Sequence, residues 1–180
     1  MAKPKVSSDW LAGCAGCHMS FLDMDERIIE LTKLVDLRST PITDLKEPDE
    51  EGVDVGILEG GISNTYNEQV AIRMRKRSRI LVALGDCAVF GGVPAMRNFY
   101  GADAALKRAY VEAESNDDSA KIPSDPELSK PVTVKPISDV VKVDVFLPGC
   151  APSADAIFAV LADLANGKIP EVKDDLNDWH

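Results

Sequence analysis

Four cysteines are the residues of this chain whose type and spacing best suit chemistry. Cys14 and Cys17 form a close pair, whereas Cys87 and Cys150 stand alone, far along the chain. A cubane iron–sulfur cluster takes four thiolates, and the chain has four cysteines in all. A close pair with two distant single cysteines suits a cage that forms where several loops converge.

Three interpretations of these thiols compete. Buried structural cysteines are common, but the cysteines here stand beside glycines, which are poor core positions: Gly13, Gly16, Gly85, Gly91, Gly92 and Gly149. A structural zinc usually takes two close pairs, and this chain has one. A [4Fe–4S] cluster fits best, because glycines let the backbone wrap closely around a bulky group and point amides at its sulfurs. Both other interpretations stay open.

The elements that must position these thiols follow an α/β pattern. Short β-branched runs predict strands over 53–58, 79–84 and 140–147, and 6–11 is strand-like; apolar residues at the helical period predict helices over 24–37, 64–76 and 153–166. Such alternation predicts a parallel sheet with helices on both faces. Each cysteine or pair follows a strand or strand-like run, and the carboxyl ends of parallel strands open on one edge, where ligands bind. We therefore expect the four thiols to meet there.

The length of 180 residues fits one domain, over 1–180. The alternation of strands and helices is interrupted by a long loop around 98–139. Within it, 100–113 is expected to be helical, and the remainder, which contains spaced prolines, is expected to be irregular. Long ordered loops usually serve function or pack on a partner.

Composition narrows the location and the partners. The formal net charge of −10 argues against nucleic acid and against an anionic membrane surface. The basic run 73–79 is expected to be a solvated helix face, with docking on an acidic subunit as the lesser alternative. No signal peptide, twin-arginine pair or membrane-spanning stretch is visible, so we expect a cytoplasmic location. Thiols stay reduced there, which favours metal or redox chemistry over disulfides.

Three polar residues lie near the cysteines in the sequence or at a strand end. Glu59 is either a solvated or helix-capping carboxylate, or a group beside the cluster that hydrogen-bonds an amide or passes protons. Asp86, next to Cys87, is expected to bond local amides. His18 follows Cys17 and is expected to be a surface or packing residue, since four thiols already complete a ligand set.

At this point four motifs, in order, resemble those of the small subunit of nickel–iron hydrogenases. They are Trp10 to Cys17, Leu58 to Gly61, Ala83 to Gly92, and Leu147 to Pro152, where Ala151 stands in place of a more usual proline. The run Cys17 to Asp23 is most similar to the cytoplasmic, bidirectional NAD-reducing branch. The chain has no further cysteines for the additional clusters of uptake or coenzyme-F420-linked relatives, and it lacks the tandem cysteines of the respiratory complex I relative. The family's usual acidic residue before the first cysteine is replaced by Gly13, so a proton route there is not expected.

The resemblance implies a flavodoxin-like domain whose Cys14, Cys17, Cys87 and Cys150 hold a proximal [4Fe–4S] cluster. The nickel–iron centre would lie in a separate large subunit, contacted by apolar loop residues: Ile42, Leu45, Val93, Met96 and Phe99. Electrons would pass between that centre and diaphorase subunits carrying FMN and iron–sulfur clusters, for the overall reaction H₂ + NAD⁺ ⇌ NADH + H⁺.

Further possibilities remain open. The run Ser63 to Thr65 could cradle the phosphate of an FMN, although the usual glycine-rich loop is absent. A zinc-stabilised interaction module without a redox role is the main rival function. An iron–sulfur subunit of a quinone oxidoreductase is the third.

Overall fold

A five-stranded parallel sheet forms the centre of the computed structural model, which describes residues 2–44, 50–117 and 119–170. The strands lie in the order β2-β1-β3-β5-β7: β2 Asp36–Ser39, β1 Lys5–Trp10, β3 Val53–Glu59, β5 Ser78–Leu84 and β7 Val145–Leu147. Every neighbouring pair is parallel. This order, with its reversal beside β1, is that of a flavodoxin-like sheet, so the predicted fold class is confirmed.

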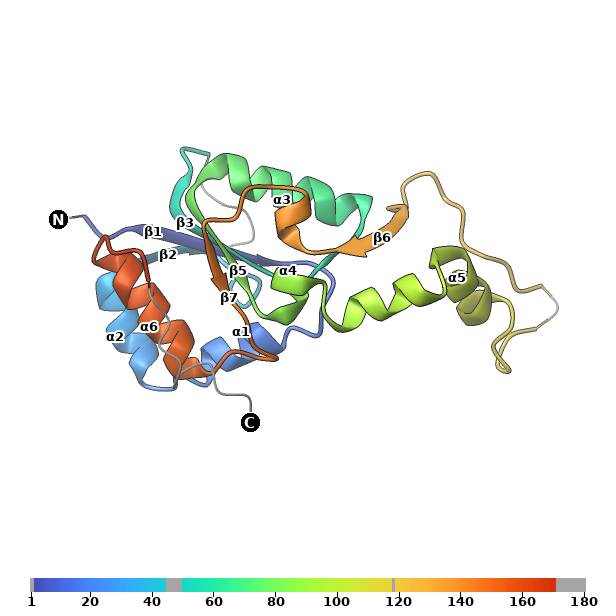
Figure 1. The fold of residues 1–180 in the computed structure, drawn as a ribbon, viewed down its shortest axis with the longest axis horizontal. Helices are drawn as coiled ribbons and strands as arrows, with labels where there is room; N and C mark the ends of the chain where they lie inside the picture. Colours follow the sequence, from blue (N-terminus) through green and yellow to red (C-terminus); the bar gives the residue numbers. More distant parts are fainter. Residues whose placement is uncertain (1, 45–49, 118, 171–180) are drawn as a thin grey trace.

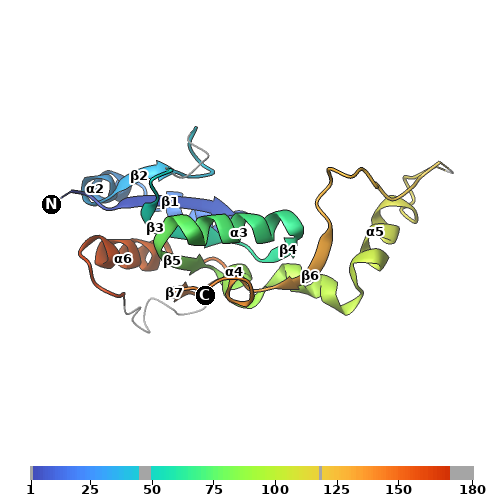
Figure 2. The ribbon, with the colours of Figure 1, turned by 90° about the horizontal axis from the view of Figure 1, so that it is seen from above.

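Helices cover both faces of the sheet, as predicted (Figures 1 and 2). One face carries α1 Gly16–Leu22, α2 Arg27–Leu34 and α6 Ala154–Ala165, with a core built around Leu31, Ile157 and Leu161. The other carries α3 Thr65–Arg77 and α4 Asp86–Phe90, with Val70, Met74 and Leu81 in its core. The central strands are therefore buried on both sides, which explains their near-continuous apolar sequences.

Local sequence explains where two of these helices begin. The side chain of Asn64 accepts a hydrogen bond from the Asn67 amide at 2.8 Å, and Ser153 accepts one from the Ala156 amide at 3.2 Å. Both satisfy amides that the first helical turn leaves without an intrahelical partner. The apolar stripe of α6 is buried at the helical period, at Ile157, Val160, Leu161 and Leu164.

Two predicted elements were too long. The helix expected over 24–37 ends at Leu34, because the chain turns at Val35 into β2, an edge strand that pairs with β1. The strand expected over 140–147 reduces to β7, preceded by a short 3₁₀ helix, η2 Ile137–Asp139. The valines before β7 instead pack against the core on the α3 side, so their β-branched run reflects burial rather than strand pairing.

The segment around 98–139 leaves the body and returns to it. After η1 Val93–Phe99 the chain forms α5 Ala102–Tyr110, which has no buried residue, and it projects away from the sheet (Figures 1 and 2). It returns in β6 Pro131–Lys135, which pairs antiparallel with β4 Ile62–Asn64. The sequence did not predict β6, since it begins with Pro131 and is followed by Pro136. Within the described ranges, none of the helices is long and apolar enough to cross a membrane.

Candidate metal centre

The four cysteines lie beyond the carboxyl ends of the parallel strands. Cys14 follows β1 and Cys17 lies in the first turn of α1, Cys87 lies in α4 directly after β5, and Cys150 follows β7. All four are free thiols. Cys14 and Cys150 are exposed, and Cys17 and Cys87 are partly buried. The topology thus brings together cysteines separated by up to 136 positions (150 − 14).

Cys17 and Cys87 lie within electrostatic range of the other thiols. Burial raises the pKa of the Cys17 thiol far above its usual range, and the charges of Glu59, Cys87, Cys14 and Cys150 raise it further. Burial also raises the pKa of Cys87, with contributions from Cys150, Cys14 and Glu59, while a hydrogen bond from the Val93 backbone opposes the shift. A deprotonated set at this edge therefore needs a cationic centre to stabilise it.

Three glycines leave the space that the sulfurs use. A Cβ added at Gly85, where φ is +83°, would lie 2.3 Å from the Cys17 sulfur. At Gly92, with φ +52°, it would lie 2.8 Å from the Cys87 sulfur, and at Gly16, 3.1 Å from that of Cys14. A side chain at Gly85 or Gly92 would therefore displace a thiol. The contact at Gly85 also joins the turn after β5 to the thiol on α1.

Asp86 links two of the cysteine turns. Its carboxylate accepts a hydrogen bond from the Gly149 amide at 2.7 Å, and its own amide donates to the Gly149 carbonyl at 2.9 Å. The residue before Cys87 is thereby tied to the residue before Cys150.

Glu59 is a buried carboxylate at the end of β3, with 2% of its surface exposed. It accepts hydrogen bonds from the backbone amides of Cys17, at 3.4 Å, and His18, at 2.9 Å. It therefore covers the amino end of α1, where the helix carries its positive partial charge. Of the possibilities raised by the sequence, the solvated carboxylate is wrong.

His18 is buried too, against Glu59 on one side and Ser8 on the other. Its ring meets that of Trp10 edge-on, with centroids 5.8 Å apart. The sequence indicated only a packing or surface residue, since nothing in the spacing connects His18 with Glu59, 41 positions away. Only the parallel pairing of β1 with β3 brings the two segments together.

The run Ser63 to Thr65, raised as a possible phosphate cradle, has its polar groups engaged elsewhere. Asn64 caps α3, the amide and hydroxyl of Ser63 donate to the side chain of Asn67, and Thr65 bonds the backbone of Lys130. A flavin at this loop stays a prediction without structural support.

The four thiols form a set of soft donors. Among the described residues no three His, Cys, Asp or Glu side chains gather closely enough to hold one metal ion. A tetrahedral zinc would bring its thiolate sulfurs to about 3.8 Å from one another, given Zn–S bonds of about 2.3 Å. Four soft sulfur donors with glycines beside them are the kind of ligand set that a four-iron cubane takes.

Comparison with known proteins defines the class. Residues 14–164 match the family described as NADH ubiquinone oxidoreductase, 20 Kd subunit. The match covers most of the chain, and the chain belongs to this family.

Particular relatives narrow the resemblance. The chain is 42% identical to the NAD-reducing hydrogenase HoxS subunit delta of Cupriavidus necator, over 97% of this chain and 85% of that protein. It is 36% identical to a chain of the F420-non-reducing hydrogenase vhu of Methanocaldococcus jannaschii, over 93% of this chain and 58% of the relative. The chain thus spans most of the first relative and little more than half of the second.

Solved structures agree. A chain of an NAD⁺-reducing [NiFe]-hydrogenase crystallised in the H₂-reduced state superposes with a TM-score of 0.93 at 36% identity, covering 99% of this chain and 100% of that one. A chain of the [NiFeSe]-hydrogenase of Dm. baculatum shares the fold, with a TM-score of 0.59 at 21% identity, over 97% of this chain and 69% of its own. The resemblance to the NAD-reducing nickel–iron hydrogenases is confirmed.

Proposed function

We propose that this chain is the electron-transfer small subunit of a cytoplasmic NAD-reducing [NiFe] hydrogenase. Cys14, Cys17, Cys87 and Cys150 hold one [4Fe–4S] cluster, proximal to a nickel–iron centre on the large subunit. The observation that carries the proposal is the convergence of all four thiols at one edge of the sheet, with Cys17 in electrostatic range of the other three.

The residues of this chain prepare the site for electron transfer. When bound, the cluster accepts and releases one electron at a time. Partial burial of Cys17 and Cys87 limits the access of water to that side of the site. The charge of Glu59 lies near both thiols, and a negative charge there disfavours the added electron.

An exposed apolar surface beside Cys87 supports a large partner. It comprises Phe90, Val93, Met96, Phe99 and Tyr100, the last two being 83% and 80% exposed. Contiguous apolar surfaces usually mark interaction sites. We assign this surface to the large subunit, which places the partner next to the proposed cluster.

The other expected contact residues differ. Ile42 is half-buried and lines an internal cavity, so it does not belong to this surface. Leu45 lies outside the described residues. Diaphorase subunits with FMN and iron–sulfur clusters complete the proposed relay to NAD⁺, for which no surface is assigned.

Purification of the native complex tests the proposal. We expect four irons per copy of this chain in addition to those of its partners, nickel in the large subunit, and broad visible absorbance. In Cys87→Ala, the electron paramagnetic resonance signal of this cluster should disappear and hydrogen-dependent NAD⁺ reduction should fall to background. An intact cubane signal in that variant refutes the assignment of Cys87.

The same preparation separates the rival functions. A colourless protein with bound zinc identifies an interaction module. Quinone-dependent activity without hydrogen uptake identifies a quinone-oxidoreductase subunit, the activity that the family description names. Flavin counted in the hydrogenase module alone decides whether this chain binds FMN.

A further inference from the structure

The buried ring of His18, in the first turn of α1, contacts side chains from two strands. Its Nδ1 lies in hydrogen-bond contact with a carboxylate oxygen of Glu59, at the end of β3. Its Nε2 lies 2.9 Å from the hydroxyl of Ser8, in β1. All three side chains come from different elements, so the ring connects α1, β1 and β3.

The chemistry of Glu59 assigns a proton to Nδ1 of His18. The carboxylate of Glu59 already accepts from two backbone amides, and a carboxylate can only accept. Nδ1 must therefore carry a proton and donate it to Glu59. Nε2 lies within hydrogen-bond distance of the Ser8 hydroxyl, so both ring nitrogens have a partner.

The helix α1 depends on this arrangement more than an ordinary helix does. It has seven residues, no side-chain cap from its own N-cap position, and no acidic residue in its first turn. A helix this short is marginal in water. Glu59 supplies the missing acceptor from outside, on the amides of Cys17 and His18.

We propose that His18 is a positioning residue: by donating to Glu59 it holds that carboxylate on the amino end of α1 and so fixes the Cys17 sulfur. The role rests on the proposed function, because it acts on a ligand of the proposed cluster. It needs no change in protonation.

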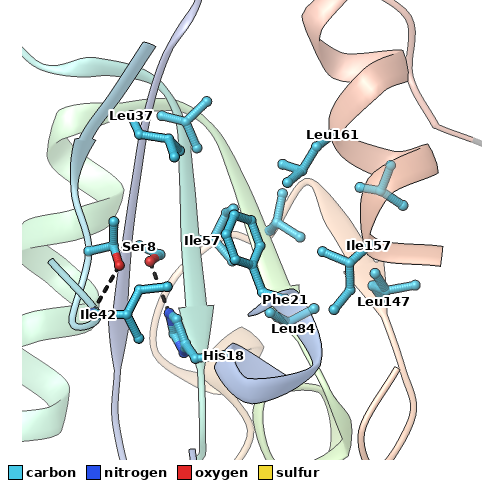
Figure 3. A pocket seen from close by; sticks show the side chains of 14 residues that line it. Ser8, His18, Phe21, Leu37, Ile42, Ile57, Leu84, Leu147, Ile157 and Leu161 are labelled. Atoms are coloured by element: carbon cyan, nitrogen blue, oxygen red, sulfur yellow. Dashed lines mark hydrogen bonds between the residues drawn. The ribbon is translucent and has the colours of Figure 1, made fainter. Parts of the chain in front are cut away.

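The surroundings of the ring explain why it cannot be replaced by any group of similar size. His18 and Ser8 contribute polar atoms to a cavity otherwise walled mainly by apolar side chains, among them Phe21, Ile57 and Leu161 (Figure 3). An apolar residue at position 18 would fit that wall. It would leave the Glu59 carboxylate without its side-chain donor, which is costly for a buried charge.

Three substitutions separate the roles of the ring. His18→Leu fills the space without a donor. His18→Asn places an amide nitrogen near the position of Nδ1, and His18→Gln places one near the position of Nε2. If the ring acts through Glu59, His18→Asn preserves the site, whereas His18→Gln and His18→Leu disturb it.

Two readouts in the purified complex test this. In His18→Leu and His18→Gln we expect the midpoint potential of the cluster to shift by about 59 mV, equivalent to a tenfold change in electron affinity. We also expect amide hydrogen exchange over residues 14–22 to accelerate about tenfold, the effect of losing one hydrogen bond to a charged group. His18→Asn and the control Asp144→Asn, which alters a carboxylate away from the thiols, should keep both at the wild-type values.

A double-substitution cycle tests whether the effect passes through Glu59. In a Glu59→Gln background, His18→Leu should add no further shift of the potential. Three results overturn the proposal. They are wild-type values of both readouts in His18→Leu, changes in His18→Asn as large as those in His18→Leu, and a full additional shift of the potential when His18→Leu is added to Glu59→Gln. If His18→Leu yields no folded complex, His18→Gln takes its place, because it also lacks a donor near the position of Nδ1, and wild-type values in that variant overturn the proposal.

The two proposals fail differently. A wild-type complex without iron–sulfur absorbance refutes the proposed function, while exchange over 14–22 still tests His18, because that readout needs no cluster. If a His18→Leu complex carries the cluster and exchanges faster over 14–22, but its midpoint potential is unchanged, the positioning role is overturned. The proposed function then still stands.

Discussion

Asp86 and Gly149 bind each other in both directions, through the carboxylate and the backbone of Asp86. The pair lies directly before Cys87 and Cys150, so two turns that are 63 positions apart behave as one unit. The carbonyl of Gly149 also lies near the open side of Gly85, which faces Cys17. Hydrogen bonds thus join the turns that carry Cys87 and Cys150, and the turn before Cys87 lies against the Cys17 sulfur.

Removing the Asp86 acceptor should loosen this unit. We expect Asp86→Ala to lower the free energy of unfolding by about 1.5 kcal/mol, the cost of a hydrogen bond to a charged group, and to reduce iron content. Asp86→Asn keeps an acceptor oxygen and should retain most of both. Thermal unfolding and iron analysis of the purified complex measure the difference; equal losses in the two variants contradict this role.

Gly85→Ala should displace the Cys17 sulfur. The added methyl group would stand 2.3 Å from it, and the alanine would keep a strained backbone at φ +83°, ψ 164°. We expect iron content to fall to background, by metal analysis and visible absorbance.

Gly101 provides a matched control, with nearly the same backbone at φ +82°, ψ 160° and nothing within 4 Å of an added Cβ. Gly101→Ala carries the same strain, about 1–3 kcal/mol, without a steric clash. It should keep its iron. Comparable iron loss in both variants means that backbone strain, and not contact with Cys17, is responsible.

Glu59→Gln should raise the midpoint potential of the cluster. The carboxylate adds negative charge near Cys17 and Cys87, and its removal favours the reduced cluster. With an effective dielectric constant of about 20, a charge about 8 Å away contributes about 2 kcal/mol, so we expect a positive shift on the order of 50 mV after partial screening.

Redox titration followed by electron paramagnetic resonance measures this potential. Glu68→Gln removes a carboxylate on α3 that is paired with Lys135, and it serves as the control. A negative shift in Glu59→Gln, or an equal shift in both variants, contradicts the electrostatic role.

Asp144 should stabilise the chain only above acidic pH. Burial alone would raise the pKa of its carboxyl, but hydrogen bonds from the Leu81 amide, Arg75 and Lys142 outweigh it and lower that pKa. A carboxyl whose folded pKa lies below its unfolded value of about 3.9 adds stability above that pH and loses it as the pH falls through the folded pKa. At pH 7 we expect the free energy of unfolding of Asp144→Asn to be about 1 kcal/mol lower than that of the wild type. The difference should shrink below about pH 4 in unfolding measurements; a constant difference down to pH 2 excludes this linkage.

The parallel character of the sheet and the edge that carries the cysteines could be predicted from sequence because both follow from local patterns. Buried β-branched runs mark parallel strands, and the topology of such a sheet places every residue after a strand at one edge. The caps Asn64 and Ser153 are equally local. These features need no knowledge of the tertiary contacts.

The features that were missed depend on contacts between distant segments. β2 is a four-residue edge strand whose pattern continues that of α2, so only its pairing with β1 distinguishes it. β6 pairs with β4 across 67 positions, from Asn64 to Pro131. The role of Glu59 toward His18 likewise requires the register between β1 and β3, which no local pattern specifies.

The lengths of the parallel strands also set where the thiols lie. Each cysteine, or pair of cysteines, follows the end of a strand. Each residue of a strand advances the chain by about 3.3 Å, and successive side chains point to opposite faces of the sheet. Deleting a single residue from β5 would shift Cys87 toward the centre of the sheet and reverse the side chains that follow the deletion. The thiol would then be misplaced even though the chain would keep all four cysteines. The lengths of these strands therefore help to set the positions of the sulfur atoms.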